Sequence, residues 1–536
     1  MGYTGAMIAF LHGYLLDGSG SNLWTRHILQ ALSNQQVPAH IVCQEPHPEN
    51  FGFIKSAYSY ESPNKSSTLF ESSGGTITFH KPLLKGWLPV FLKDHYEEFG
   101  TVIPLTELSD EKIEEYIQHN VDILKPLVKS QGWHHLVANH TLLMPVIAQR
   151  LKKQTGVTYT VIPHGSALEY AVRRQERLKV LAASALRDAE SIFTVSPEIA
   201  SRLESLFPEE DFSQKVYRSA VGVDTSEFHC TNHSERETEI QSFLQILPKE
   251  RGRKHQISFP NKFSMSELDR WLETQQDYSS KLPDESLEDF ILDIDWENEK
   301  TLIFVGRIIL AKGLQSVLLA LPQIMKSVPH TRFLVVGHGP YREPAELLWK
   351  QLCQGNFDAI DTILDWGSPK EGESSQHYLD GARAFWSHIK ESPGWGDYQR
   401  AAKHCKVDSV IFTGFLNHHQ LAKLLPSIDV GVFPSIVPEA GPMVLLEAVA
   451  SGCFPIGMNQ AGIAANLDII SQSFPEATAH LMRVNSHSKK CIFDFMEKTP
   501  QCLVLPSQAS QLRKVAEKNF DWKTVAAQLL TLLPRE

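Results

Sequence analysis

Residues 7–43 read MIAFLHGYLLDGSGSNLWTRHILQALSNQQVPAHIVC. The apolar run at 7–12 predicts a buried strand, and residues 16–22 predict a glycine-rich turn. Apolar residues at helical spacing come next, and residues 39–43 have the composition of a second strand. Strand, glycine loop, helix and strand in this order are typical of the start of a doubly wound α/β domain.

The same alternation continues along the chain and starts again at Lys300. The first series predicts strands and helices in turn: strands at 135–138, 158–162 and 191–195, helices at 142–152 and 168–189. The second series does the same: strands at 302–305, 332–336, 410–413, 430–433 and 453–456, helices at 313–325, 443–451 and 522–533. Two series predict two Rossmann-like domains, with a ligand bound where they face each other.

Two stretches interrupt this alternation. One is polar and ends in an acidic run, and the other is rich in Gly, Ser and Trp. We therefore expect five parts: an N-terminal Rossmann-like domain at 1–228, an insertion or linker at 229–299, a C-terminal Rossmann-like domain at 300–517, an insertion within it at about 341–405, and a closing helix at 518–536.

Composition fits an enzyme of a reducing compartment. The chain has 536 residues, 42% of them hydrophobic, which is enough for two cores. Its net charge of -11 argues against a nucleic-acid partner. The seven cysteines form no Cys-x-x-Cys pair, so neither a zinc site nor a disulfide framework is predicted. The apolar start at 1–16 lacks a basic leader and is too short to span a bilayer, so we expect a cytoplasmic protein.

The clearest candidate site is Pro438-Glu439-Ala-Gly-Pro-Met-Val-Leu-Leu-Glu447. One glutamate follows a predicted strand and the other lies in the next helix, whose first N–H groups are free to bind an anion or sugar hydroxyls. Carboxylates accept hydroxyl hydrogen bonds well, so the pair suits a polyhydroxylated ligand. On spacing alone, the favoured interpretation is one helix-capping glutamate and one solvated helix glutamate.

A second candidate is Phe304-Val-Gly306-Arg307-Ile-Ile-Leu-Ala-Lys312-Gly313. Here a strand places an Arg and then a Lys at the start of a helix. Two cations beside a helix N-terminus can bind a pyrophosphate, and a plain surface pair is the alternative.

With both motifs in one domain and in this order, the chain resembles the retaining family 4 glycosyltransferases of the GT-B fold (glycosyl transferases group 1). The resemblance covers nearly the whole chain apart from the two insertions. It rests also on five shorter motifs: the loop Gly18–Ser21, Gly222-Val-Asp224, Phe433-Pro-Ser435, Ala461-Gly-Ile463 and Phe520-Asp-Trp522.

The resemblance implies a hexosyltransferase that retains the anomeric configuration, with an acceptor-side domain at 1–228 and a nucleotide-sugar-binding domain at 300–517. Arg307 and Lys312 would hold the donor diphosphate, Glu439 the donor sugar, and Glu447 the nucleotide ribose. His140 matches a histidine that approaches the donor sugar. Further donor-binding positions are Gly18, Gly20, Gly306, Gly441, Met443 and Val444.

The implied co-substrate is a nucleotide-diphosphate sugar, most simply a UDP- or GDP-sugar, with no cofactor and no metal. The acceptor is a glycan, a lipid or a small molecule, and peripheral membrane contact stays open. There are two departures from the family pattern: Val221 replaces an Asn, and Gly441-Pro442 replaces a Phe-Gly pair, which puts the donor sugar in doubt. Pro442 has no N–H to offer the sugar.

Other signals are weaker. His164-Gly-Ser166 follows a strand end and suits the acceptor side as well as a turn. Asp293-Ile-Asp295 resembles a metal motif of the other major glycosyltransferase fold, but its acidic surroundings favour a solvated run. The adjacent pairs His134-His135 and His418-His419 do not face one way on a strand or helix, so they do not predict a metal site.

Three alternatives remain open. A dinucleotide oxidoreductase is suggested by Gly18-Ser-Gly20 and by Glu45 at the end of the second strand, although the third glycine of that motif is replaced by Leu23. A non-catalytic sugar-nucleotide-binding or scaffold protein on the same fold is suggested by Gly441-Pro442. The third is epimerisation or phosphorolysis on this fold, and phosphorolysis with pyridoxal would need a Schiff-base lysine that the sequence does not identify.

Overall fold

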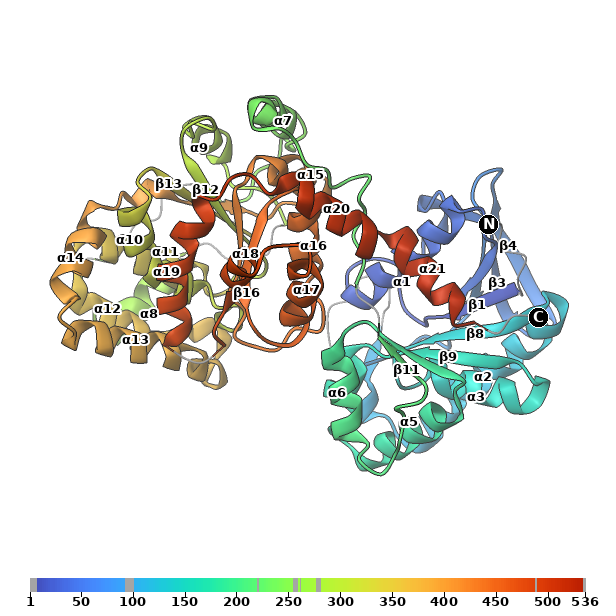
Figure 1. The fold of residues 1–536 in the computed structure, drawn as a ribbon. Helices are drawn as coiled ribbons and strands as arrows, with labels where there is room; N and C mark the ends of the chain where they lie inside the picture. Colours follow the sequence, from blue (N-terminus) through green and yellow to red (C-terminus); the bar gives the residue numbers. More distant parts are fainter. Residues whose placement is uncertain are drawn as a thin grey trace. The chain divides into compact units, whose positions relative to one another are not determined.

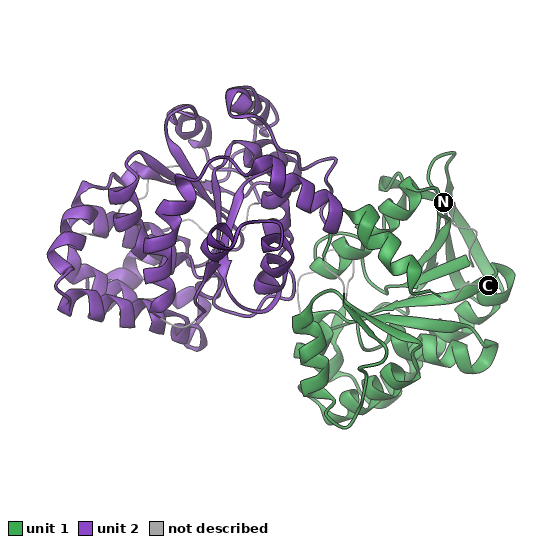
Figure 2. Ribbon diagram, viewed as in Figure 1, with its two compact units in different colours: residues 1–222, 520–536 green, residues 223–519 purple. Residues whose placement is uncertain are grey.

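The computed structural model describes residues 7–91, 101–218, 221–253, 259–260, 262–275, 281–486 and 489–533. The chain forms two compact units (Figure 2). Unit 1 is Met1–Gly222 with Phe520–Glu536, and unit 2 is Val223–Asn519. The expectation of a buried strand near the start of the chain extended to residues 1–6, which lie outside the described residues.

Unit 1 contains a nine-stranded sheet in the order β11-β10-β9-β8-β1-β2-β5-β3-β4. The strands are β1 (Met7–Leu11), β2 (Ala39–Val42), β3 (Ile54–Ser62), β4 (Lys65–Glu71), β5 (Ile77–Pro82), β8 (Trp133–Asn139), β9 (Thr158–Ile162), β10 (Ser191–Thr194) and β11 (Val216–Arg218). β3 and β4 pair antiparallel, and the remaining pairs of this sheet are parallel. A separate short sheet pairs β6 (Leu88–Val90) with β7 (Val102–Pro104).

The helices of unit 1 cover both faces of this sheet (Figure 1). They are α1 (Gly20–Asn34), α2 (Asp110–Ser130), α3 (Met144–Thr155), α4 (Gly165–Ala167), α5 (Glu176–Asp188), α6 (Pro197–Leu206) and α21 (Trp522–Thr531). In the strand order, β2 lies on one side of β1, and β8, β9, β10 and β11 follow one another on its other side. Right-handed crossovers therefore place α1 on one face and α3, α5 and α6 on the opposite face.

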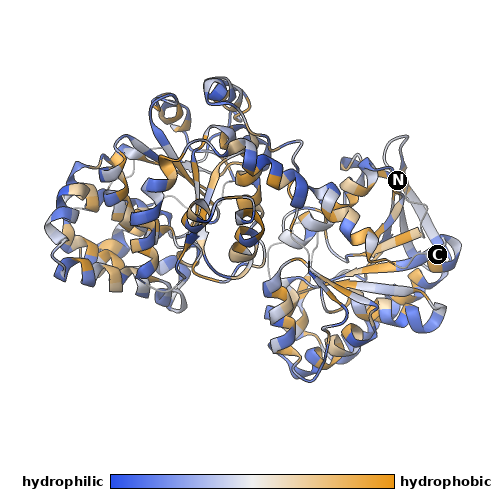
Figure 3. Cartoon of the chain, viewed as in Figure 1, coloured by the Kyte–Doolittle hydropathy of each residue, from blue (hydrophilic) through white to orange (hydrophobic). Residues whose placement is uncertain are grey.

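Buried apolar strands hold this unit together, as the hydropathy colouring shows (Figure 3). Ile8–Leu11 of β1 are completely buried, as expected for a central parallel strand covered on both faces. α21 reaches unit 1 from the far end of the sequence, and its Trp522 ring stacks on His27 with 5.1 Å between ring centroids. A Cβ at Gly222 would lie 2.3 Å from the same ring, so a glycine is needed there.

The predicted helix at 168–189 is interrupted: residues 168–172 and 176–188 are helical, and residues 173–175 are not. A π-helical turn, η3 (Leu168–Val172), comes first, and α5 begins only at Glu176. Gln175 between them is extended, and its side-chain amide donates to the Thr106 carbonyl at 2.8 Å. Arg177 donates to the Leu108 carbonyl at 2.7 Å. These contacts to a distant segment compensate for the helical hydrogen bonds lost at the break.

Unit 2 contains a parallel six-stranded sheet in the order β14-β13-β12-β15-β16-β17. The strands are β12 (Lys300–Val305), β13 (Thr331–Val336), β14 (Val410–Gly414), β15 (Val430–Phe433), β16 (Phe454–Met458) and β17 (Arg483–Val484). The helices α10 (Leu314–Ser327), α15 (His418–Leu424), α16 (Met443–Ala450), α17 (Ala461–Ser471), α18 (Glu476–Leu481), α19 (Lys490–Leu503) and α20 (Ala509–Asn519) connect or follow them.

Both stretches that interrupt the sequence pattern contain helices of unit 2. The first contains α7 (Arg236–Gln245), α8 (Met265–Glu273) and α9 (Leu287–Leu292). The second joins β13 to β14 and contains α11 (Arg342–Gln354), α12 (Phe357–Trp366), α13 (Asp380–Glu391) and α14 (Trp395–His404). In the part of the chain that the structure describes, no helix is both long and apolar enough to cross a membrane.

Candidate active site

The predicted donor residues Arg307, Lys312 and Glu439 lie in unit 2, where neighbouring strands β12 and β15 send the chain to opposite sides of the sheet. Open α/β sheets bind ligands beyond the carboxyl ends of the strands at such a switch point. Two loops meet here, residues 306–313 after β12 and residues 434–442 after β15. Gly313 has φ +76°, and a Cβ on it would lie 1.9 Å from the Pro434 carbonyl oxygen. Only glycine allows this approach.

Lys312 and Glu439 are brought together by these loops. The Lys312 ammonium lies 2.7 Å from the Glu439 carboxylate, with side chains 28% and 19% exposed. On the first loop, the Ala311 carbonyl accepts a hydrogen bond from the Ile436 N–H at 2.9 Å. On the other side, the Gly462 N–H donates to the Glu439 carbonyl at 2.7 Å. The pair is therefore held by backbone contacts on both sides.

Arg307 lies on the same loop and is exposed to solvent. It acts electrostatically on His338, which follows β13: burial and the charge of Arg307 lower the pKa of His338. His338 Nδ1 is buried and has no hydrogen-bond partner among the described residues. Its ring meets Phe415, after β14, with 5.7 Å between centroids. No sequence motif predicts His338 as a site residue; the signal that could have found it is its place directly after β13, the strand beside β12.

Glu447 is buried in α16, with 2% of its surface exposed, so it is not the solvated helix residue that spacing alone allowed. Its Oε1 lies 2.9 Å from Nδ1 of His418, and its buried Oε2 has no hydrogen-bond partner among the described residues. The neighbour His419 instead lies 3.6 Å from Glu227. The two histidines face different ways, as predicted, and one of them belongs to the site.

The first turn of α16 completes this region. Pro442 occupies the cap position directly before Met443. The N–H groups of Met443 and Val444 therefore belong to the first turn, where helix geometry leaves them without carbonyl partners inside the helix. Gly441, Met443 and Val444 are half-buried, and so is Gly306 beside Arg307. An anion placed at this turn would also meet the positive end of the helix dipole.

Unit 1 has its own switch point between neighbouring strands β1 and β8. After β1 come Gly18, with φ +95°, and Gly20, the first residue of α1; space is open beside both. After β8 comes His140, with φ +70°. A left-handed backbone is costly for a residue with a Cβ, and Leu143 nearby has φ +61° as well. Backbone strain of this kind is concentrated at functional sites.

His140 is 2% exposed, and neither ring nitrogen has a hydrogen-bond partner among the described residues. Burial and the nearby His164 and His12 hold its pKa well below the usual value, so the ring is neutral. Its ring centroid lies 4.9 Å from that of His164 and 5.8 Å from that of His12. His140 is thus a buried polar group with hydrogen-bonding capacity to spare.

A buried polar network runs beside His140. His164 Nε2 lies 3.0 Å from Asn139 Oδ1, and Asn139 donates to Thr25 Oγ1 at 3.0 Å. Thr25 Oγ1 lies 3.3 Å from His12 Nδ1. His164 therefore has a structural partner, while Ser166 is half-buried in the short α4. His12, Thr25 and Asn139 were not selected from the sequence.

Glu45, the residue that suggested a dinucleotide site, binds backbone N–H groups of its own unit. It is 7% exposed and accepts hydrogen bonds from the Leu16 N–H at 3.0 Å and the His47 N–H at 3.3 Å.

His135 is buried on β8 while His134 is exposed, so these two histidines also face opposite ways. Among the residues with described positions, no group of three or more His, Cys, Asp or Glu could hold a metal ion.

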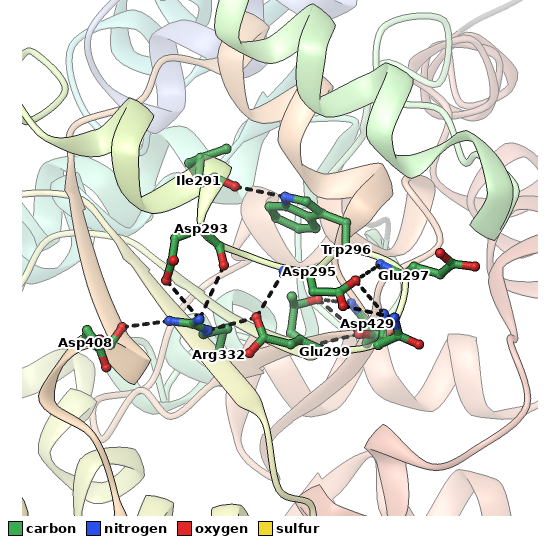
Figure 4. Close-up of polar contacts among 11 residues, drawn as sticks. Ile291, Asp293, Asp295, Trp296, Glu297, Glu299, Arg332, Asp408 and Asp429 are labelled. Carbon is green, nitrogen blue, oxygen red and sulfur yellow. Dashed lines mark hydrogen bonds and ion pairs between the residues drawn. The ribbon is translucent and has the colours of Figure 1, made fainter.

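Asp293 and Asp295 are exposed to solvent and also bind protein groups (Figure 4). Asp293 Oδ2 accepts from Arg332 at 3.0 Å, and Glu299 accepts from the same guanidinium at 2.9 Å. Asp295 accepts from the Asn298 amide at 2.9 Å. Both residues are exposed, as the interpretation as a solvated run predicts, and Asp293 also joins the segment before β12 to Arg332 of β13.

Comparisons with known proteins find similarity to glycosyltransferases. Residues 396–468, which include β14, β15, α16 and the whole loop with Glu439, match the family described as "Glycosyl transferases group 1". A 166-residue stretch is 26% identical to an uncharacterized glycosyltransferase of Methanocaldococcus jannaschii and covers 31% of this chain. The match spans 28% of the length of that curated relative.

Two solved structures are similar to this chain. The catalytic domain of starch synthase IV from Arabidopsis thaliana, bound to ADP and acarbose, is 11% identical with a TM-score of 0.53 over 99% of both chains. Anabaena HepE in complex with UDP is 11% identical with a TM-score of 0.49 over 98% of both chains. The predicted GT-B fold with two Rossmann-like domains is confirmed. The chain therefore has the GT-B fold, and residues 396–468 match the group 1 glycosyltransferase family, in agreement with the enzyme class that the sequence predicts.

Proposed function

We propose that this protein is a retaining hexosyltransferase that moves a sugar from a nucleotide-diphosphate donor to an acceptor hydroxyl. The observation that supports this most is the contact between Lys312 and Glu439 at the β12/β15 switch point, with Arg307 on the same loop. A cation for the diphosphate and a carboxylate for the sugar lie side by side there. This is what a nucleotide-sugar site requires.

Each residue has a role in the proposed reaction. Arg307 and Lys312 bind the diphosphate and stabilise the charge that develops as it leaves. Glu439 contacts the donor sugar, and Glu447 accepts hydrogen bonds from the ribose through the oxygen that has no partner in the described chain. The acceptor oxygen bonds to the anomeric carbon as the bond to the phosphate oxygen breaks. The leaving diphosphate keeps that electron pair and takes the acceptor proton.

Unit 1 supplies the acceptor side in this proposal. Gly18 and Gly20 let a ligand approach the backbone closely, because the space beside both is open. His140 stays neutral through burial, so it acts as a hydrogen-bonding group toward the sugar and not as a cation. His164 and Ser166 remain acceptor-side candidates, and we expect the acceptor to be a glycan, a lipid or a small molecule.

A non-catalytic nucleotide-sugar-binding protein is a second candidate, and one observation favours it. Pro442 caps α16 where an N–H would otherwise point at the sugar. The two candidates differ in turnover and agree in donor binding, so binding is tested first.

The test is a thermal-shift titration of the full chain with UDP-, GDP- and ADP-sugars and with NAD. A ligand that binds only the folded state raises Tm, by an amount that grows with its concentration relative to Kd. We expect one nucleotide sugar to raise Tm, Arg307→Ala to lose the shift, and Arg400→Ala, which removes an arginine whose side chain is 71% exposed, to keep it. A shift with NAD alone, or with no nucleotide sugar, would contradict the proposal.

A further inference from the structure

The region between β13 and β14 places the carboxylate of Glu371 against the loop at 306–313. Glu371, in the short helical turn η6 (Pro369–Glu371), accepts the Leu310 N–H with both oxygens, at 3.0 and 3.3 Å. Leu310 begins the turn η5 (Leu310–Lys312), whose last residue is the cation that contacts Glu439. Glu371 thus holds the peptide two residues before the predicted diphosphate-binding lysine.

The other side of the same residue is held as well. Gln315, completely buried in α10, donates its side-chain amide to the Leu310 carbonyl at 3.0 Å and to the Tyr378 carbonyl at 3.2 Å. Tyr378 lies in the turn η7 (Glu373–Leu379), directly after Glu371. Both polar groups of Leu310 are therefore tied to residues 371–378.

This segment is itself well anchored. The Glu371 N–H donates to the Ser368 carbonyl at 2.9 Å, and Ser368 is completely buried. The Tyr341 N–H donates to the Ile308 carbonyl at 3.0 Å, which joins the start of the inserted helices to the same loop. Burial raises the pKa of Glu371, whereas the Leu310 N–H and the charge of Arg307 act in the opposite direction. The Glu371 carboxylate therefore accepts a hydrogen bond from the loop backbone and interacts electrostatically with Arg307.

A single turn of 3₁₀-helix has little stability of its own, because its few hydrogen bonds are poorly aligned. Its orientation depends on outside contacts, and a hydrogen bond to a charged acceptor is about twice as strong as a neutral one. Glu371 provides such a contact. We propose that Glu371 is a positioning residue for Lys312, and that the helical region between β13 and β14 supports the donor site through it. This inference rests on the proposed function.

The experiment compares the full-length wild type with Glu371→Ala, Glu371→Gln and Glu373→Ala. Glu373 is exposed and lies two residues away, so its variant is the matched control. Hydrogen exchange of peptides covering 306–313 reports how firmly the loop is held, and titration with UDP, GDP and ADP reports diphosphate binding. For Glu371→Ala we expect faster exchange and a Kd weakened about tenfold, the effect of losing one charge-assisted hydrogen bond. Glu371→Gln keeps an acceptor oxygen and should restore part of both.

The outcomes separate the inference from the proposed function. Faster exchange and weaker binding in Glu371→Ala, with Glu373→Ala unchanged, would support the positioning role. Unchanged exchange, or faster exchange with unchanged Kd, would overturn it while wild-type binding leaves the proposed function standing. If the wild type binds none of the three nucleotides, the proposed function fails and the inference fails with it. Should Glu371→Ala not fold, Glu371→Gln against Glu373→Ala gives the same decision.

Discussion

Lys312 and Glu439 meet because single residues hold the two loops in place. Gly313 permits contact with Pro434, and Gly462, whose added Cβ would lie 2.4 Å from the Ala440 carbonyl oxygen, permits contact from the other side. Ala461 beside it has φ +45° and so carries backbone strain. These positions tolerate no added atom, whereas the charged side chains between them stay accessible to a ligand.

His418 is the residue whose role is easiest to separate from its surroundings. Its contact with Glu447 orients a carboxylate whose other oxygen is left for a ligand. We expect His418→Gln to raise the donor KM about three- to tenfold with little change in kcat, because a weakened hydrogen bond at a binding residue costs roughly 1 kcal/mol. His419→Gln is the matched control and should leave both constants unchanged. Equal effects of the two substitutions would refute this role for His418.

Among single residues, the sequence predicts the candidate site residues that follow strands. It does not predict those that become neighbours only when the chain folds. Arg307, Lys312, Glu439 and Glu447 were chosen because each stands at a strand end or in the next helix. His418 belongs to α15 and reaches Glu447 of α16 across the sheet edge, and no local pattern encodes that contact. His338 is not predicted as a site residue, because a single histidine between two glycines is not a specific motif.

Among the elements, β8 carries a buried histidine that makes unit 1 sensitive to acid. His135 lies 2.7 Å from Thr158 Oγ1 and 2.8 Å from Thr160 Oγ1, and burial lowers its pKa to about 4. The unfolded chain has the ordinary value of about 6.5. As pH falls from 7 to 5, the unfolded chain gains a proton at this position that the folded chain does not, so the free energy of unfolding falls by roughly 2 kcal/mol for this histidine.

Replacing His135 by Gln should remove that part of the pH dependence. The measurement is urea unfolding at pH 7 and pH 5, followed by hydrogen exchange of β8 peptides so that unit 1 alone is observed. The difference in unfolding free energy between the two pH values should shrink by roughly 2 kcal/mol in His135→Gln. It should stay as in the wild type in His134→Gln, whose histidine is the exposed neighbour. An unchanged difference in His135→Gln would show that burial of this ring does not control acid stability.

Apolar strands were the easiest elements to predict from the sequence. β9 and β15 have the predicted bounds because each is a short apolar run covered on both faces. β3, β4 and β5 were missed, since β4 is almost entirely exposed and has no apolar periodicity. The helices α11–α14 were missed because their glycines suggested loops. Gly355 and Gly367 instead follow directly after α11 and α12, both with positive φ, and act as helix stops.

In the whole molecule, the two large sheets share one arrangement of their strands. Each has a switch point between its first strand and a later neighbour, β1 with β8 in unit 1 and β12 with β15 in unit 2. Each switch point collects the residues with the strongest functional signals, strained His140 in one unit and the Lys312–Glu439 pair in the other. The chain returns to unit 1 through α21, whose Trp522 is 4% exposed, so the two ends of the sequence complete one fold.

Turnover is the property that separates a transferase from a binding protein on this fold. The decisive measurement is release of nucleoside diphosphate from the bound nucleotide sugar, by wild type, Glu439→Gln and the exposed control Glu476→Gln. We predict release by wild type and control, and a rate lower by about 100-fold or more in Glu439→Gln, the size expected for a group that stabilises charge in the transition state. A wild type that binds donor without releasing diphosphate, or a Glu439→Gln variant with near-normal turnover, would contradict the proposed reaction.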